Sequence, residues 1–481
     1  MFLLPFTLKM KNDFEADRRL PQISAVEQAP REITAFGGLR AFYELAESIG
    51  LRSLIDERIT IKQRERGYDD STFALAMMGV HLIGGDGLDD LERLREDAEF
   101  MRINGLEVPA CNTAADYLRK VTPGHIRQFE KMIPELLRRI DQRMACRSPR
   151  ESSTVDADSS HVVVHGHQQG ADRLHTGKVG FHPLFAFDAD RGFALNAKFR
   201  RGHTSSSGSA QDAIAFIERA FENLPEKPKQ RYFRADNGFY SVALMRWLIE
   251  QKIAFAMTAR VTSVMHMEIA KLREADWTPE PGGKGSSSGT KHRRKTALHP
   301  PEIAEFEMTV ISGERDENGR KKSITVRMVV RRHRKVTAQK GLFPDNDAGT
   351  IYHVIATNRR DLEAEALLEW ADGRANCENF IKELKYDFDA LGCGQHQFNA
   401  NAAWMHIGLL AYNLMCAMRA IAGQIGDKRA ASWRTGSWRT WLFAIPAYLT
   451  KSGRSLALKL AAALPMVQFY NDLVRAIANT T

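Results

Sequence analysis

Hydrophobic residues recur at intervals of three and four along the first third of the chain. Such spacing places them on one face of an α-helix. It predicts helices in the segments 34–51, 71–85, 88–103 and 125–144. We therefore expect an all-helical domain over residues 33–150, preceded by an N-terminal arm over residues 1–32.

One stretch of this helical region suggests a contact with DNA. The segment CNTAADYLRKVT, residues 111–122, predicts a short helix with Thr113 as its N-cap residue and with Arg119 and Lys120 at its end. A short helix followed by a turn and a second helix is typical of a helix-turn-helix element. Packing of a small helical bundle would produce the same pattern, so both interpretations stay open.

The pattern changes to short strands at residue 151. Runs rich in β-branched and aromatic residues, punctuated by Gly and Pro, predict strands within 153–164, 180–189 and 192–202. A helix at 209–224, a strand at 231–236, a helix at 241–251 and a strand at 253–260 follow. Three strands followed by alternating helix and strand predict an α/β layer with a mixed sheet, over residues 151–260.

This alternation stops between residues 261 and 350. A Gly/Ser-rich segment here contains Arg293, Arg294 and Lys295, which are candidates for DNA binding, and the runs 306–313 and 323–333 predict a β-hairpin. We expect a β-rich insertion, after which the α/β layer resumes over residues 351–400. Residues 401–481 are expected to form C-terminal helices beside it, at 404–423 and 456–477.

Composition narrows the classes of protein. With 481 residues, 43% hydrophobic and 26% charged, the chain can form two or three folded domains. A net charge of +9 favours a polyanionic partner such as DNA or RNA, but only mildly at this length. Five cysteines without a CxxC motif, and the lack of a signal peptide or of a long apolar run, predict a reduced cytoplasmic protein with no membrane partner.

Carboxylates mark the ends of two predicted strands. Asp156 and Asp158 alternate with small residues in STVDADSS, so both point to one face of their strand. Asp236 ends the strand RYFRAD and is followed by Asn237-Gly238, a turn that stops the strand. An aspartate at a strand end often merely caps the next helix, so each one alone indicates little.

The helix predicted at 372–388 carries a third carboxylate between two cations. At about 100° per residue, Arg374, Glu378 and Lys385 share one face, beside an apolar stripe of Phe380, Ile381, Leu384 and Phe388. A solvated helix with i,i+4 ion pairs would show the same pattern. Three acids from two strand ends and a helix, however, would repel one another, and their natural use is to bind divalent cations that promote phosphodiester cleavage.

The order Asp158, Asp236, Glu378, with the strand and helix run between the first two acids and the insertion before the third, resembles the catalytic core of Asp-Asp-Glu transposases of bacterial insertion sequences. RADNGFYS at 234–241 is similar to their second-Asp strand, and Arg374-x3-Glu378-x6-Lys385 fits the signature Tyr-x2-Arg-x3-Glu-x6-Lys of the branch that forms DNA hairpins. The signature tyrosine would fall on Ala371, next to Trp370, so the resemblance does not extend to the handling of a flipped or flanking base.

The resemblance implies an RNase H-like α/β fold and two Mg²⁺ or Mn²⁺ ions. It implies that Asp158, Asp236 and Glu378 are catalytic metal ligands, that Arg374 and Lys385 hold DNA phosphates, and that double-stranded DNA, as terminal inverted repeats and as target, is the partner of a homodimer assembled on the ends. The family pattern Asp-x-Ser/Thr favours Asp158 over Asp156, which is kept as a second ligand candidate.

Nearby histidines raise the alternative of zinc. Their spacing fits no common zinc motif, so we expect them to bond within loops or to contact DNA; they are His161, His165, His167, His175 and His182. Three functions stay in view: a cut-and-paste transposase of a bacterial cell, a stand-alone metal-dependent nuclease on the same core, and an inactive DNA-binding relic. The presence of all three acids and both flanking cations favours the first.

Overall fold

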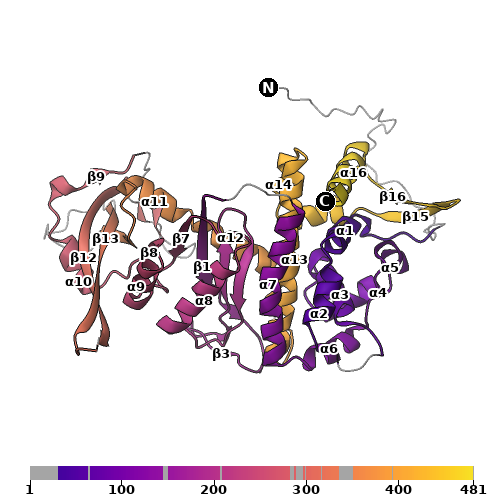
Figure 1. The fold of residues 1–481 in the computed structure, drawn as a ribbon, viewed down its shortest axis with the longest axis horizontal. Coiled ribbons are helices and arrows are strands. Elements are labelled where there is room, and N and C mark those ends of the chain that lie inside the picture. Colours follow the sequence, from indigo (N-terminus) through magenta and orange to yellow (C-terminus); the bar gives the residue numbers. More distant parts are fainter. Residues whose placement is uncertain are drawn as a thin grey trace.

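The protein is described by a computed structural model. The described residues are 31–62, 66–144, 150–205, 208–281, 287–288, 296–297, 299–315, 317–334, 350–392 and 394–479. Along its longest axis the sheet lies at one side and the N-terminal helices at the other, with α7 and α13 between them (Figure 1). This arrangement separates the predicted catalytic layer from the predicted helical region while keeping them in contact.

The N-terminal region is helical throughout its described part. Its elements are η1 (Gly37–Leu39), α1 (Arg40–Ser48), α2 (Leu51–Arg58), α3 (Asp70–Ile83), η2 (Leu88–Asp90), α4 (Leu91–Arg95), α5 (Ala98–Asn104), α6 (Cys111–Arg119) and α7 (Pro123–Arg143). Two predicted helices are divided. The helix expected at 34–51 breaks at Gly50, whose φ is +65°. The one at 88–103 breaks at Asp97, whose side chain accepts a hydrogen bond from the Phe100 N–H at 2.7 Å and begins α5.

The predicted N-cap of α6 is wrong. The helix begins at Cys111, so Thr113 lies inside it, and Ala110 is the N-cap residue without a side-chain cap bond. The Cys111 N–H instead donates to Glu92 Oε1 at 2.9 Å, and Glu92 comes from α4. A carboxylate 19 residues earlier in the chain satisfies this helix end, so no local sequence signal marks it.

A nine-stranded sheet forms the centre of the α/β layer. Its order is β6-β5-β1-β7-β8-β14-β13-β12-β9. The strands are β1 (Ser152–Ser159), β5 (Leu184–Asp188), β6 (Ala194–Lys198), β7 (Gln230–Ala235), β8 (Ile253–Thr258), β9 (Thr278–Pro279), β12 (Glu302–Arg315), β13 (Lys321–Arg334) and β14 (Thr350–Thr357). The pairs β1–β7 and β7–β8 are parallel and the others antiparallel. With α8 (Ala210–Glu222) and α9 (Val242–Glu250) packed on it, the sheet confirms the predicted mixed sheet flanked by helices.

The residues expected to form a β-rich insertion extend this same sheet. Strands β12 and β13 form the predicted hairpin. Strand β13 also pairs with β14, and β14 pairs with β8 at the edge of the catalytic layer. Shorter elements accompany them: α10 (Ser263–Ile269), η3 (Glu274–Asp276), β10 (Ser287–Ser288) and β11 (Thr296–Ala297). A separate three-stranded sheet of β2 (Val162–Val163), β3 (Asp172–Arg173) and β4 (Val179–Phe181) follows β1.

The C-terminal helices join the two sides. They are α11 (Ala364–Asp372), α12 (Ala375–Tyr386), α13 (Phe398–Gln424), α14 (Lys428–Ala431), α15 (Thr435–Trp438), the π-helical η5 (Arg439–Phe443) and α16 (Leu464–Asn479). Helix α13 packs against α7, α3 and β6, so one continuous hydrophobic core spans both sides. By length and composition α13 would suffice to cross a membrane, but 89% of its most apolar window is buried, as expected of a core helix.

The helix predicted at 456–477 is only partly present. Residues before 464 form β16 (Ser455–Leu460), which pairs with β15 (Ala447–Ser452) as a separate antiparallel ribbon. The turn contains Gly453 at φ +59°, a backbone conformation that glycine adopts without strain. Leucines at 456, 458 and 460 recur with the period of two that a strand requires, although the Leu/Ala composition suggested a helix.

Candidate active site

Two of the predicted acids lie at the ends of neighbouring parallel strands. In the register of β1 and β7, Ala157 pairs with Ala235, so Asp158 and Asp236 follow at the same level of the sheet. The backbone N–H of Ser159 donates to Asp158 Oδ1 at 2.7 Å, and that of Gly238 donates to Asp236 Oδ1 at 2.9 Å. The two strand ends therefore hold both carboxylates next to each other.

Helix α12 brings the third acid to the same place. Arg374, the N-cap residue of α12, donates from Nη1 to Asp158 Oδ2 at 3.0 Å and from Nη2 to Glu378 Oε1 at 3.3 Å. The Asp158 side chain is mostly buried, whereas that of Glu378 is 48% exposed. The cluster thus opens to solvent on the side of α12, as the common face of Arg374 and Glu378 predicted.

The apolar stripe of α12 fixes this helix on the core. Ile381, Leu384 and Phe388 are buried, and the Phe380 ring lies 5.3 Å from that of Phe187 on β5. Because the stripe and the charged face lie side by side on the helix, burial of the stripe orients Glu378 towards the strand ends.

Burial and the neighbouring carboxylate charge both act on the pKa of Asp158. Burial, and after it the charge of Asp236, raise the pKa of Asp158 to about 6, while Arg374 acts in the opposite direction. Burial likewise raises the pKa of the neighbouring Cys377 thiol well above its usual range, so this sulfur stays protonated. The acids therefore carry stored repulsion that a cation would relieve.

The chemistry of the donor groups fits a hard divalent cation. All three acids offer oxygen atoms, which Mg²⁺ and Mn²⁺ prefer, and the adjacent thiol is not ionised. In the conformation of the described residues, no three His, Cys, Asp or Glu side chains converge closely enough to hold a metal ion. The guanidinium of Arg374 lies between Asp158 and Glu378 and supplies the compensating charge.

Asp156 has a different environment from Asp158. It pairs with Arg234 in the strand register and is 0% exposed. Arg234 donates from Nε to Asp156 Oδ1 and from Nη2 to Asp156 Oδ2, each at 2.8 Å. Both carboxylate oxygens are therefore engaged within the protein. Sequence reasoning missed Arg234, although it lies two residues before Asp236 and so faces the same side of the sheet.

The position of the signature tyrosine is filled by packing. Ala371 is buried in a small cluster at the base of α11. The neighbouring Trp370 ring lies 5.5 Å from the guanidinium of Arg234 and 4.6 Å from that of Arg359, and its centroid is 5.6 Å from the Tyr232 ring. Trp370 thus makes cation–π contacts with two arginines.

Lys385 and the histidines border the cluster. Lys385 Nζ donates to the carbonyl of His161 at 2.9 Å, and the His161 ring lies 4.3 Å from His175 and 4.2 Å from His182. Burial lowers the pKa of His182 to about 4, so this ring is neutral. Its Nδ1–H donates to the Thr204 carbonyl at 2.8 Å, which leaves Nε2 to accept from the Ser159 hydroxyl at 2.9 Å.

A basic groove begins beside Asp236. Its volume is about 560 Å³, and its lining carries cations and histidines without a carboxylate; the lining includes Arg173, His175, His182, His203, Gly238 and Arg260. Arg260 Nε donates to the carbonyl of Asn237 at 3.2 Å, which ties the groove to the turn after Asp236.

Comparison with known proteins assigns the chain to a family. A family model described as transposase DDE domain group 1 matches residues 22–481. The chain belongs to this family of DDE transposases. No curated protein sequence matches it significantly. A cryo-EM structure of the piggyBac transposase synaptic complex with hairpin DNA is similar at 12% identity, over 93% of this chain and 85% of that chain, with a TM-score of 0.40.

The remaining predicted DNA-binding residues of this DDE transposase lie far apart in the chain. Arg119 ends α6, where it forms an ion pair with Asp116, and Lys120 is exposed in the turn before α7. Arg293, Arg294 and Lys295 lie outside the described residues.

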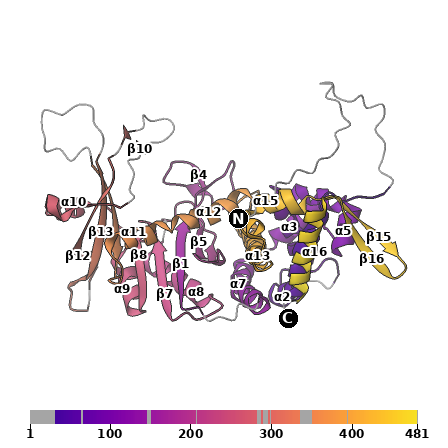
Figure 2. The ribbon, with the colours of Figure 1, turned by 90° about the horizontal axis from the view of Figure 1, so that it is seen from above.

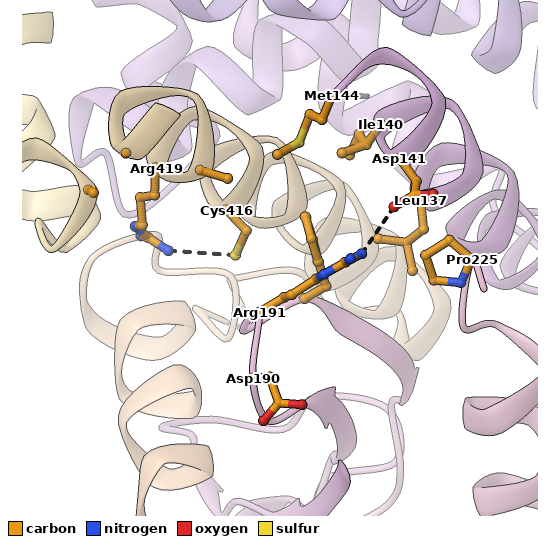
Figure 3. A pocket seen from close by; sticks show the side chains of 13 residues that line it. Leu137, Ile140, Asp141, Met144, Asp190, Arg191, Pro225, Cys416 and Arg419 are labelled. Atoms are coloured by element: carbon orange, nitrogen blue, oxygen red, sulfur yellow. Dashed lines mark hydrogen bonds and ion pairs between the residues drawn. The ribbon is translucent and has the colours of Figure 1, made fainter. Parts of the chain in front are cut away.

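An apolar pocket between α7 and α13 is a poor candidate for the chemistry of a DDE transposase (Figure 3). Its volume is about 370 Å³, and its polar groups are already paired: Arg191 bonds to Asp141 at 3.0 Å, and Arg419 contacts Cys416 Sγ at 3.6 Å. Burial raises the pKa of the Cys416 thiol to about 12, which removes its nucleophilic form at neutral pH.

Proposed function

We propose that this DDE transposase is the DNA transposase of a bacterial insertion sequence, which binds its element's terminal inverted repeats and catalyses phosphodiester cleavage and strand transfer. One observation carries the proposal: Asp158 and Asp236 end adjacent parallel strands, and Arg374 links Asp158 to Glu378 on α12. Their order in the chain is that of the Asp-Asp-Glu series. Family membership over residues 22–481 supports the same reaction class.

The three acids would hold two Mg²⁺ or Mn²⁺ ions. When bound, such ions activate the attacking oxygen and stabilise the leaving oxygen in phosphodiester cleavage. Asp156 is left out of the proposed ligand set, because both of its oxygens accept hydrogen bonds from Arg234. The role of Asp156 would then be to hold β1 against β7 and so to fix the direction of Asp158.

Cations around the acids would position the DNA backbone. Arg374 contacts two of the acids, and Lys385 lies further along the same face of α12. The two are spaced to contact phosphates on either side of the scissile one. Both side chains would contact the negative charge of a phosphate, which suits the DNA backbone rather than a base. The basic groove beside Asp236 would accept the continuing strand.

The wider architecture supports the finer parts of the proposal. Strand β5 lies antiparallel to β1, and β6 lies antiparallel to β5. Strands β7 and β8 lie parallel to β1 on its other side, an order expected of an RNase H-like core. We assign recognition of the ends to the N-terminal helices, with Arg119 and Lys120 at the end of α6. Assembly of two copies on paired DNA ends completes the proposal.

Product analysis tests this function. Purified protein is incubated with Mg²⁺ or Mn²⁺ and labelled DNA that carries one end of its element, and a second reaction supplies a pre-cut end with a target plasmid. A transposase cleaves at the end and joins the pre-cut end to the plasmid. Cleavage without joining would favour a stand-alone nuclease, and binding without cleavage would favour an inactive relic.

A further inference from the structure

The ribbon formed by β15 and β16, residues 447–460, is a basic surface that the proposed chemistry does not use. It projects beyond the helices at the end of the molecule opposite to the hairpin β12–β13 (Figures 1 and 2). It contains Lys451, Arg454 and Lys459 and no acidic residue. All three cations are exposed, and none forms an ion pair within the described part of the chain.

Several arginines on the other long hairpin are neutralised. Arginines of β13 each bind glutamates: Arg327 contacts Glu305, Arg331 contacts Glu280, and Arg332 contacts Glu274 and Glu302. These three arginines therefore have little charge to offer a polyanion. By contrast, the three cations of the C-terminal ribbon are uncompensated, so no existing ion pair has to break before they bind a polyanion.

The cations are distributed over the whole ribbon. Lys451 pairs across the strands with Leu456, and Lys459 pairs with Tyr448. Tyr448 and Lys451 are an odd number of residues apart on β15, so the two lysines lie on opposite faces of the ribbon. Arg454 lies at the tip, in the turn between the strands. A ribbon inserted tip-first into the major groove of DNA meets phosphates on both walls, and this distribution supplies a cation to each wall.

The base of the ribbon is fixed while its tip is free. Thr34 and Ala447 exchange backbone hydrogen bonds at 2.9 and 3.0 Å, and the Leu449 N–H donates to Glu99 Oε1 at 2.5 Å. Near the tip, Leu456 is 69% exposed. Anchoring at one end reduces the entropy that binding would cost, and the exposed leucine near the tip would contact base edges such as the thymine methyl.

We propose that the C-terminal ribbon binds duplex DNA, with its tip in the major groove and Lys451, Arg454 and Lys459 on the phosphates of both strands. The proposal rests on the proposed function only in taking DNA as the partner. It adds a contact that is separate from the acids, since the ribbon is anchored on the N-terminal helices and not on the catalytic sheet.

Salt-dependent binding tests the ribbon. The variant Lys451→Ala/Arg454→Ala/Lys459→Ala is compared with a control that also removes three exposed cations, each already paired with a carboxylate: Lys229→Ala/Lys271→Ala/Arg273→Ala. Fluorescence anisotropy follows binding to a short labelled duplex of arbitrary sequence at several salt concentrations. Each lost phosphate contact lowers the slope of log affinity against log salt by about 0.9, so the ribbon variant should lose about 2 to 3 in slope. A slope equal to that of the control overturns the proposal.

Two further measurements keep the result unambiguous. The single variant Arg454→Ala changes only the turn, and it should lower the slope by about one while leaving the melting temperature unchanged. Binding to phosphatidylserine vesicles is measured in parallel, and a loss on vesicles but not on DNA overturns the proposal. Cleavage of the element end by the wild-type protein tests the proposed function independently. If the protein cleaves but the ribbon variant binds DNA like its control, only the ribbon proposal fails. If the protein binds DNA through the ribbon but does not cleave, only the proposed function fails.

Discussion

Replacing Asp156 with asparagine should destabilise the fold because it breaks a buried ion pair. The carboxylate is 0% exposed and accepts two hydrogen bonds of 2.8 Å from Arg234, whose guanidinium is also buried. Removing one partner of such a pair costs about 3–5 kcal/mol, since the other charge stays buried without compensation. The Asp156→Asn protein should therefore be folded but clearly less stable than the wild type.

The expected change in melting temperature follows from the size of the chain. An unfolding entropy of about 2.1 cal/mol/K per residue over 481 residues amounts to about 1 kcal/mol/K, so the melting temperature should fall by about 3–5 °C. If the α/β layer unfolds as a smaller unit, the fall is larger. Differential scanning fluorimetry measures the shift. Glu151→Gln, which removes an exposed partner of Lys229, serves as the control and should give no measurable change.

A second variant separates a structural role of Asp156 from a ligand role. Replacing the pair together, by Asp156→Leu with Arg234→Met, removes both buried charges and should recover most of the lost stability. The reasoning is refuted if Asp156→Asn melts like the wild type but no longer cleaves DNA, because Asp156 would then act as a metal ligand and not as the partner of Arg234.

Three other predictions address charges near the acids and on α6. Asp158→Asn should raise the melting temperature at pH 7 in EDTA and lose this advantage towards pH 4. The pKa of Asp158 rises from 3.8 in the unfolded chain to about 6 in the folded one, so ionisation of this carboxyl destabilises the fold as pH rises from about 4 to 6 and above. An advantage independent of pH would contradict this. Lys385→Ala should lower the salt slope of DNA binding by about one, and an unchanged slope would restrict Lys385 to its bond with His161. Arg119→Ala/Lys120→Ala should weaken binding to the element's ends more than to arbitrary duplex in competition assays, and equal losses would argue against a reading role.

Local patterns in the sequence predicted much of the layer around the acids. The apolar stripe of α12 and the alternation in STVDADSS depend only on the periods of helix and strand, which neighbouring residues determine. The position of Asp236 at a strand end followed from the Asn237-Gly238 turn after it. For these elements a few consecutive residues contain the necessary information.

Features that depend on distant residues could not be predicted in this way. The pairing of Asp156 with Arg234 requires the register of β1 against β7, and the cap of α6 comes from Glu92. The Leu/Ala-rich C-terminal segment has a composition that favours a helix, yet its first part is a strand because β15 is available to pair with it. In each case the deciding contact joins segments that the sequence alone does not place together.

The most direct test of the central claim is cleavage by Asp236→Asn. Within the described residues, this side chain forms no ion pair and accepts a hydrogen bond only from the backbone N–H of Gly238. Its replacement should therefore not disturb the fold or the affinity for DNA. With labelled element ends and either Mg²⁺ or Mn²⁺, the variant should bind as the wild type does and yield no cleaved product, because one of the three proposed ligands is lost. Cleavage at a rate comparable to the wild type would contradict the assignment of Asp158, Asp236 and Glu378 as one metal site.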